Sequence, residues 1–282
     1  MPAVPAPEVT PNQKQPARIA SFSSPGLTSR QQIDIEIFKA PPGNGIVFSV
    51  LNPKTDSYVE IKAVAANVVN TLRNVVLGKD GVRLCIVEHF LASASLWGLE
   101  DLVVRVNGPE MPLGDGSAQI WTDQFKAAGI EPTSPPATIE LQEPIVITKQ
   151  DRTLMALPDS TFSVSYMMDW NHPLIGKRWQ TWTPKMDVSE IGDARTFGSL
   201  QEHKLLGLQD DVVSLTADGF TKPLRFEDEP VRHKLLDLVG DLALAGVNPL
   251  RFKARFISIK GGHELDVEMA KRLESLVAQL QS

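Results

Sequence analysis

The stretch from Phe226 to Asp241 places polar residues inside a pattern that is otherwise apolar, and it constrains the fold more than any other part of the chain. Pro230 suits the first turn of a helix, and the acidic residues before it favour the positive end of the helix dipole. Apolar residues then recur at helical spacing, namely Val231, Leu235, Leu238, Val239 and Leu242. The pattern predicts an amphipathic helix over residues 230–245, closed by Gly246, with one side against a core.

A second stripe on the same predicted helix is polar. His233, Asp237 and Asp241 are spaced i, i+4, i+8, so they project from one side, close to the apolar stripe. Imidazole and carboxylate groups are costly to bury unless they are paired or bind a metal. A histidine and an aspartate one turn apart can bind one cation, and zinc accepts both nitrogen and oxygen. The alternative is a helix with ordinary structural ion pairs, and a metal site needs a third ligand from elsewhere.

Length and composition limit the class of protein. A chain of 282 residues suffices for one large or two ordinary domains, and 42% hydrophobic with 22% charged residues is typical of a globular protein. The net charge of -6 disfavours general nucleic-acid binding. The single cysteine, Cys85, excludes an intramolecular disulfide and suits a reducing compartment. No apolar run has the length of a transmembrane helix, so we expect a cytoplasmic protein without stable membrane insertion.

The order of the predicted elements suggests an internal duplication. Residues 1–18 are rich in proline and are predicted to be a disordered leader, followed by a first α+β domain at 19–131 and a second at 137–282. Strands are predicted at 33–38, 102–106, 145–148, 162–167 and 251–259, and helices at 86–97, 118–128, 230–245 and 264–280. Each half therefore runs sheet, helix, strand, helix. We predict two duplicated sheet-plus-two-helix domains that pack together with the active site between them.

Two further histidines are candidates to complete the site. Glu88-His89 interrupts apolar residues at the start of the predicted helix 86–97. Adjacent helical residues point about 100° apart, so His89 can bind a metal while Glu88 acts on a water there. Gly261-Gly262-His263 places another histidine at the start of the last helix. A carboxylate such as Asp241 can orient its ring and hold it protonated.

Six segments, in this order along the chain, carry a resemblance to a known family. They are Val87-Glu88-His89, residues 109–118 (PEMPLGDGSA), Asp169-Trp170-Asn171-His172-Pro173, Ala194-Arg195-Thr196-Phe197-Gly198, residues 224–241 and Gly262-His263. Together these segments, which extend over most of residues 20–280, resemble the UDP-3-O-acyl-N-acetylglucosamine deacetylases of lipid A biosynthesis.

The resemblance implies a zinc-dependent amide hydrolase that removes the N-acetyl group of UDP-3-O-(3-hydroxyacyl)-N-acetylglucosamine, giving a free amine and acetate. It implies a monomer whose only expected partner is this acylated UDP-sugar. The resemblance implies that Zn²⁺ is bound by His89, His233 and Asp237. It implies that Glu88 is the general base, that His263, held by Asp241, is the acid, and that Thr196 polarises the oxyanion. It also implies that Lys234 contacts the diphosphate and that Phe197 forms an apolar wall. Because Lys234 is next to His233 along the helix, we expect it to point away from the face of His233 and Asp237.

Some features depart from the family pattern. Thr28 stands where the family has a histidine in a Gly-Leu-His segment, and the acyl-binding insert between Gly198 and Leu224 is shorter. We therefore expect weak discrimination among acyl lengths. One alternative is a relative that binds the nucleotide-sugar without hydrolysing it, and another is a fusion to a hydroxyacyl dehydratase, for which the chain has no room.

Other polar residues have plain structural explanations. His172 is expected in a loop and His203 in solvent. The environment of Cys85 is that of a buried thiol rather than a nucleophile. Asp115-Gly116 indicates a turn.

Overall fold

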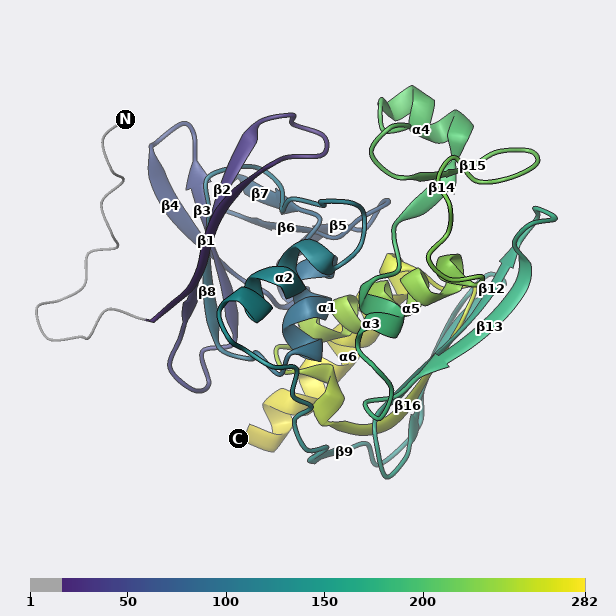
Figure 1. Cartoon of the computed structure of the whole chain (residues 1–282). Coiled ribbons are helices and arrows are strands. Elements are labelled where there is room, and N and C mark those ends of the chain that lie inside the picture. The colour runs from purple at the N-terminus through teal and green to yellow at the C-terminus, as the bar shows by residue number, and fades with distance from the viewer. Residues whose placement is uncertain (1–16, 282) are drawn as a thin grey trace, which may run out of the picture.

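Two sheets, one from each half of the chain, enclose a central layer of helices in the computed structural model, which describes residues 17–281 (Figure 1). The first sheet has the order β1-β2-β8-β3-β4. Its strands are β1 (Arg18–Pro25), β2 (Gln32–Lys39), β3 (Ile46–Asn52), β4 (Ser57–Lys62) and β8 (Leu102–Val106). The second sheet has the order β10-β11-β16-β12-β13, and β9 also pairs with β16. Its strands are β9 (Ile139–Glu140), β10 (Ile145–Lys149), β11 (Arg152–Pro158), β12 (Ser163–Trp170), β13 (Gly176–Trp182) and β16 (Phe252–Ile259).

The two sheets share one topology. In each sheet two hairpins come first along the chain, and the strand that follows them in the sequence lies between the two hairpins. β8 is antiparallel to β2 and parallel to β3, and β16 is likewise antiparallel to β11 and parallel to β12. Alternation explains the first sheet, because Ile33, Ile35 and Ile37 of β2 are all buried on one face. The predicted duplicated α+β architecture is confirmed.

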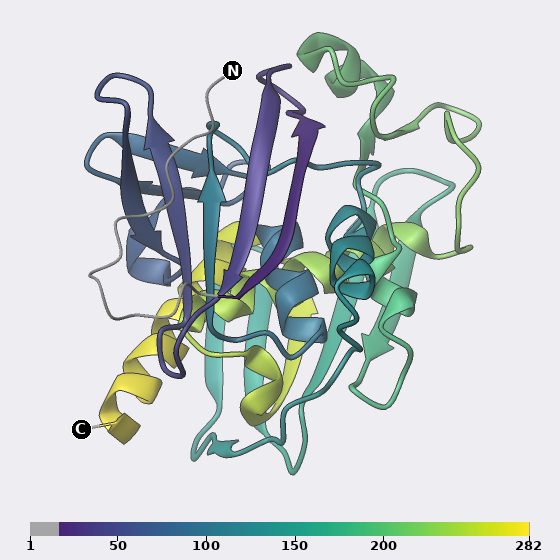
Figure 2. The same cartoon turned by 60° about the vertical axis from the view of Figure 1, so that its left-hand side comes forward.

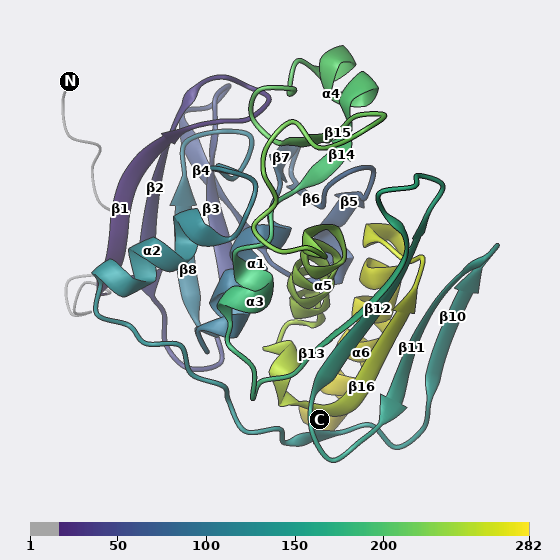
Figure 3. The same cartoon turned by 45° about the vertical axis from the view of Figure 1, so that its right-hand side comes forward.

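The helices between the sheets follow the same order in each half. They are α1 (Glu88–Leu96) and α2 (Gln119–Ala127) in the first half, and α5 (Glu229–Leu242) and α6 (His263–Gln281) in the second, with the short helices α3 (Ser189–Gly192), η1 (Ala65–Asn67), η2 (Ala243–Ala245) and η3 (Pro249–Arg251). Figure 2 shows α1 and α2 against the first sheet, and Figure 3 shows α5 and α6 against the second. All nine residues of α1 are buried, because it lies between the first sheet and α5.

Two small sheets lie at the end of the molecule where α5 begins. One consists of β5 (Val68–Asn70), β6 (Val76–Lys79) and β7 (Val82–Cys85). The other pairs β14 (Phe197–Ser199) in parallel with β15 (Val213–Leu215), connected by α4 (Leu200–Leu206). β14, α4 and β15 stand together above α5 in Figure 3.

The β14-α4-β15 unit occupies the segment in which a shortened insert was predicted. Val212 packs with Ile86 and Leu113 of the first half, whereas Leu205 is 83% exposed. The prediction that His203 is solvated is wrong, because its ring is buried in this unit and Nδ1 lies 2.8 Å from Ser214 Oγ. α4 packs on β14 and β15, so the ring of His203, which α4 carries, is enclosed between the helix and these strands.

The predicted leader and linker differ in what the structure describes of them. Residues 1–16 of the predicted leader lie outside the described residues, while Arg18 already pairs with Phe38 in β1. Residues 131–136, the predicted linker, have no helix or strand. No helix among residues 17–281 has both the length and the apolar run needed to cross a membrane.

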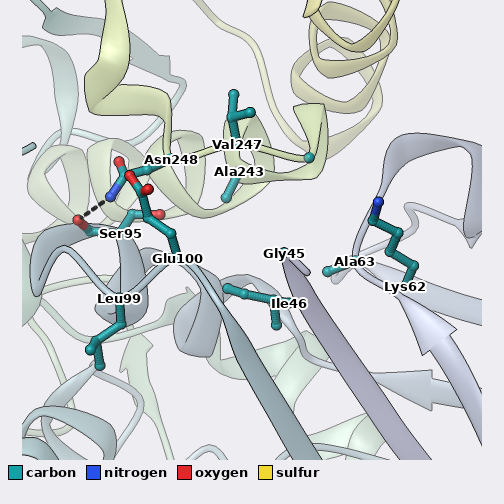
Figure 4. A pocket seen from close by; sticks show the side chains of 11 residues that line it. Gly45, Ile46, Lys62, Ala63, Ser95, Leu99, Glu100, Ala243, Val247 and Asn248 are labelled. Atoms are coloured by element: carbon teal, nitrogen blue, oxygen red, sulfur yellow. Dashed lines mark hydrogen bonds between the residues drawn. The ribbon is translucent and has the colours of Figure 1, made fainter. Parts of the chain in front are cut away.

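The two halves also meet at a small cavity near the C-terminal ends of α1 and α5, and residues of both halves line it (Figure 4). Asn248 Nδ2 donates a hydrogen bond of 2.9 Å to the carbonyl oxygen of Ser95 at this cavity. Arg251 and Glu100 form an ion pair with an Nε–Oε1 distance of 2.6 Å close by. These contacts connect the end of α1 to the turn after α5 and leave little free volume between them.

At the crossing of α1 and α5 the two backbones touch. A Cβ added at Gly240 of α5 would overlap the carbonyl oxygen of Glu88 and lie 2.9 Å from its carbonyl carbon and 3.2 Å from Ala92 N. Backbone atoms inside a helix cannot yield as the end of a side chain can. Only glycine therefore permits this approach of the two halves.

We predict that Gly240→Ala lowers the free energy of unfolding by about 1–3 kcal/mol, the usual cost of overpacking, although alanine is the better helix former. Urea unfolding of Gly240→Ala beside Gly192→Ala measures this effect. Gly192 ends α3 and has no atom within 4 Å of its added Cβ, so it serves as the control. Equal unfolding midpoints for the two variants would contradict the proposed contact.

Candidate metal centre

The crossing at Gly240 brings together His89 of α1 and the pair His233 and Asp237 of α5. Nε2 of His89 lies 3.8 Å from Asp237 Oδ1, and Nε2 of His233 lies 3.4 Å from the same oxygen. One ligand atom from each residue falls within 4.8 Å of the others, and all three side chains are buried. This is the spacing of ligands around one cation.

Backbone carbonyls fix the tautomer of both histidines. Nδ1 of His89 donates to the carbonyl oxygen of Ser117 at 3.2 Å, and Nδ1 of His233 donates to that of Ala194 at 3.0 Å. Since a carbonyl can only accept, each Nε2 keeps its lone pair and faces Asp237. A second hydrogen bond of this kind is the usual support of a metal-binding histidine.

The charge states of the three groups also suit a cation. Burial lowers the pKa of His89 and lowers that of His233 to about 4, so both rings are neutral near pH 7. Burial alone would raise the pKa of Asp237, but His233, Lys234 and His263 outweigh it and hold the pKa below its usual range. Two neutral imidazoles and one carboxylate are the donor set that catalytic zinc accepts, and iron or cobalt would fit the same set.

Lys234 does not point away from this group, so that prediction is wrong. Its Nζ is 2.7 Å from Asp237 Oδ2, the oxygen that does not face the histidines. Burial alone would lower the pKa of Lys234, but the Asp237 carboxylate outweighs this and raises it. The long side chain bends along the helix to a residue three positions on. Lys234 Nζ also lies 6.0 Å from the centre of the Phe197 ring.

Glu88 stands beside His89 at the start of α1. The residue is 3% exposed, and its carboxylate accepts a hydrogen bond of 3.1 Å from the backbone N–H of Val75. Burial raises the pKa of Glu88 to about 7, and nearby Asp241 and Asp237 contribute while His263 opposes them. A carboxylate with this pKa can take up and release a proton near neutral pH.

His263 and the fully buried Asp241 form a pair in the second half. His263 Nδ1 donates to Asp241 Oδ2 at 2.7 Å. Burial alone would lower the pKa of His263, but Asp241 outweighs it and raises the pKa to about 10. His263 is therefore cationic at neutral pH and can donate a proton or stabilise an anion.

Thr196 reaches the same place from the loop between α3 and β14, which contacts the first half. Its N–H donates to the carbonyl oxygen of Gly116 at 2.6 Å, and its Oγ1 lies 3.2 Å from His233 Nε2. Gly116 has φ of +96°, so the turn predicted at Asp115-Gly116 needs glycine there. Asp115 also contacts Arg225 of the second half.

Several supporting residues were not foreseen from the sequence. The buried carboxylate of Glu229 accepts from Arg195 Nε at 2.8 Å and from the N–H groups of Arg195 and Arg225. This network holds the segment that carries Thr196 against α5. Its only sequence signal is an acidic residue beside Pro230. Phe197, the predicted wall residue, packs with its ring centre 6.3 Å from that of His233.

Thr28, at the position of the expected family histidine, does not contact the three predicted ligands in the structure. Its N–H and Oγ1 donate to the buried carboxylate of Glu110, with an Oγ1–Oε2 distance of 2.8 Å. Ser29 N–H donates to the same group at 2.7 Å. The Gly26-to-Ser29 turn thus closes around Glu110.

Comparisons with known proteins identify the family of the chain. A family model described as UDP-3-O-acyl N-acetylglycosamine deacetylase matches residues 13–275. Proteins named UDP-3-O-acyl-N-acetylglucosamine deacetylase are similar to the chain over nearly its whole length. The one from Thermosynechococcus vestitus is 31% identical, covering 95% of this chain and 96% of the relative. The one from Nostoc sp. is 36% identical, covering 92% and 97%, and that from Geotalea uraniireducens is 35% identical, covering 90% and 86%. The chain therefore belongs to the UDP-3-O-acyl-N-acetylglucosamine deacetylase family.

Proposed function

We propose that this protein hydrolyses the N-acetyl group of UDP-3-O-(3-hydroxyacyl)-N-acetylglucosamine, giving acetate and the free amine for lipid A biosynthesis. Family membership supports the substrate class. The observation that carries the reaction type is the convergence of a buried three-residue ligand set with a carboxylate of raised pKa and a cationic histidine. The single cysteine supports a cytoplasmic location, and we infer that the protein acts as a monomer.

His89, His233 and Asp237 are the residues that would hold the metal, and two nitrogen donors with one carboxylate favour Zn²⁺. Such an ion, when bound, would polarise the acetamide carbonyl and make water more acidic. The fit rests on the fixed tautomers and the carboxylate charge of Asp237 described above.

The protein's own groups supply the proton transfers. Glu88 accepts a proton from the water whose oxygen attacks the acetamide carbon. Thr196 donates a hydrogen bond to the carbonyl oxygen as negative charge develops there. His263 then gives its proton to the sugar nitrogen as the C–N bond breaks. Because an amide has a poor leaving group, a base and a separate acid both speed the reaction.

Lys234 and Phe197 are proposed to contact the substrate. The Lys234 side chain is 23% exposed, and its charge suits a phosphate oxygen. Its ion pair with Asp237 means that it also holds a proposed metal ligand. Lys234→Ala is therefore expected to affect metal retention as well as KM. A change in KM alone would show that the ion pair has no role in metal binding.

The ligand assignment leads to a prediction about metal binding. His233→Ala should lose both the metal and activity, because two protein ligands rarely retain zinc. Metal content after dialysis, measured by mass spectrometry, checks this, with His172→Ala as a histidine variant outside the ligand set. Full metal occupancy in His233→Ala would refute the ligand assignment.

The role of Glu88 leads to a prediction about proton transfer. Glu88→Gln should keep the metal and lose acetate release by about 10²-fold, the scale of a positioned proton acceptor. Activity should rise with pH as Glu88 loses its proton, with a midpoint at or below about 7 because a bound cation favours the carboxylate. It should be lost once His263 loses its proton near pH 10.

Acetate release is measured across pH to test both the rise and the fall of activity, with the variant of an exposed residue, Glu60→Gln, as the control. If Glu88→Gln keeps the wild-type rate, Glu88 is not the base. A wild type that binds the nucleotide-sugar but releases no acetate would indicate the binding-only alternative.

The short β14-α4-β15 unit leads to a prediction about the acyl chain. Each methylene that loses its contact costs about 0.8 kcal/mol, so a passage shorter by a few carbons weakens binding more than tenfold. With Leu205 exposed on α4 and Val212 packed against the first half, kcat/KM should depend weakly on acyl length. Substrates that differ only in acyl length provide the measurement, and a steep optimum at a long chain would contradict it.

A further inference from the structure

Behind His263 lies a group of buried polar side chains that the proposed reaction does not use. Asp266 is one turn along α6 from His263, Ser258 comes from β16, and Asp241 comes from α5. Asp266 is 1% exposed and the other two are fully buried. Three elements thus each contribute one of these side chains, and the charge of Asp241 acts on Asp266.

Four oxygens in this group have no hydrogen-bond partner within residues 17–281. They are Asp241 Oδ1, Ser258 Oγ and both carboxyl oxygens of Asp266. Buried polar atoms are nearly always paired in native proteins, with protein atoms or with ordered water. His263 uses only Oδ2 of Asp241, so the opposite oxygen is left to other partners.

Gly261 shows that Ser258 and Asp266 border the same space. A Cβ added at Gly261 would overlap Ser258 Oγ and lie 3.6 Å from Asp266 Oδ1. Tyr166 Oη donates to the carbonyl oxygen of Gly261 at 2.8 Å, which fixes this turn. The two oxygens are thus held beside one position by the strand, the turn and the helix.

We propose that Asp266, in its neutral form, is a positioning residue that holds Asp241 Oδ1 through one buried water shared with Ser258. A buried water typically makes about three hydrogen bonds and needs two to four polar partners, which these side chains supply. The carboxyl proton of Asp266 is donated to the water, and the water donates to Asp241. This fixes the carboxylate that orients His263. The role rests on the proposed function of His263 as the acid.

The charges around Asp266 support the neutral form. Burial raises the pKa of Asp266 to about 8, and the negative charges of Asp241 and Asp237 on α5 act in the same direction. His263 on the same helix and Lys234 on α5 oppose them. Tyr166 on β12 faces the group as a neutral hydroxyl, because burial raises its pKa. At pH 7 Asp266 therefore carries its proton, and above about pH 8 it becomes negative.

Replacing Asp266 by asparagine or by alanine separates the effect of its neutral hydrogen-bond donor from the effect of its ionisable charge. Asn keeps a neutral donor, so Asp266→Asn should retain kcat at pH 7 within about twofold. Asp266→Ala removes the donor and should lower kcat about tenfold with KM unchanged, because Asp266 does not touch the substrate. Glu268→Gln is the control, since Glu268 lies on the same helix and its side chain is 41% exposed.

A second readout is independent of activity. The His263 ring should titrate at lower pH in both Asp266 variants, because neither can gain the negative charge that Asp266 gains above pH 8. NMR of the ring nitrogens follows this titration in the full chain, and Glu268→Gln should match the wild type. If Asp266→Ala does not fold, the NMR titration of Asp266→Asn and the kcat of Ser258→Ala, expected to fall severalfold, replace it.

Three outcomes would overturn the proposal. The first is an Asp266→Ala enzyme with wild-type kcat and His263 titration, and the second is an increase in its KM alone. The third is an Asp266→Asn enzyme as slow at pH 7 as Asp266→Ala, which would require an ionised Asp266. Failure of the proposed function would instead show as a wild type that releases no acetate, with the NMR titration still interpretable.

Discussion

The contact between the backbones of α1 and α5 at Gly240 is the constraint on which the site depends. With no side chain at this position, the α5 backbone lies directly against the carbonyl group of Glu88. The metal-binding candidates come from the turns next to this contact, His89 on one helix and Asp237 on the other. A wider separation, such as the 8–10 Å usual between helix axes with side chains in the contact, would move these ligands apart. The duplicated fold serves the site by bringing equivalent helices of the two halves face to face.

Burial in this crossing then sets the charge of each group. It keeps His89 and His233 neutral and available as ligands, and it raises the pKa of Glu88 to about 7. The His263 side chain is 10% exposed, yet its contact with Asp241 outweighs burial and raises its pKa to about 10. Environments that assign opposite proton states to neighbouring groups are the usual mark of an acid and a base in one site. The chemistry thus follows from which buried group has a charged partner.

Much of this arrangement could be predicted from the sequence, because its signals are local. The strand at residues 102–106 matches β8, and the polar stripe of α5 is buried as its spacing indicated. What was missed depends on distant contacts. The three-residue strands β14 and β15 are too short to show alternation, so the burial of His203 had no signal. The bend of Lys234 toward Asp237 depends on side-chain rotamers. The close backbone contact at Gly240 exists only once the two helices cross. Ser258 and Asp266 look like ordinary polar residues of a strand and a helix until the turn at Gly261 brings them together.

The central claim is that two helices from different halves of the chain supply one metal site. Anomalous X-ray diffraction from crystals of the metal-loaded protein, collected on both sides of the zinc absorption edge, tests it most directly. The account predicts one anomalous peak bonded to Nε2 of His89, Nε2 of His233 and a carboxylate oxygen of Asp237, at the roughly 2.0–2.2 Å typical of zinc. A peak that lacks His89, or one that lies away from the crossing of α1 and α5, would contradict it.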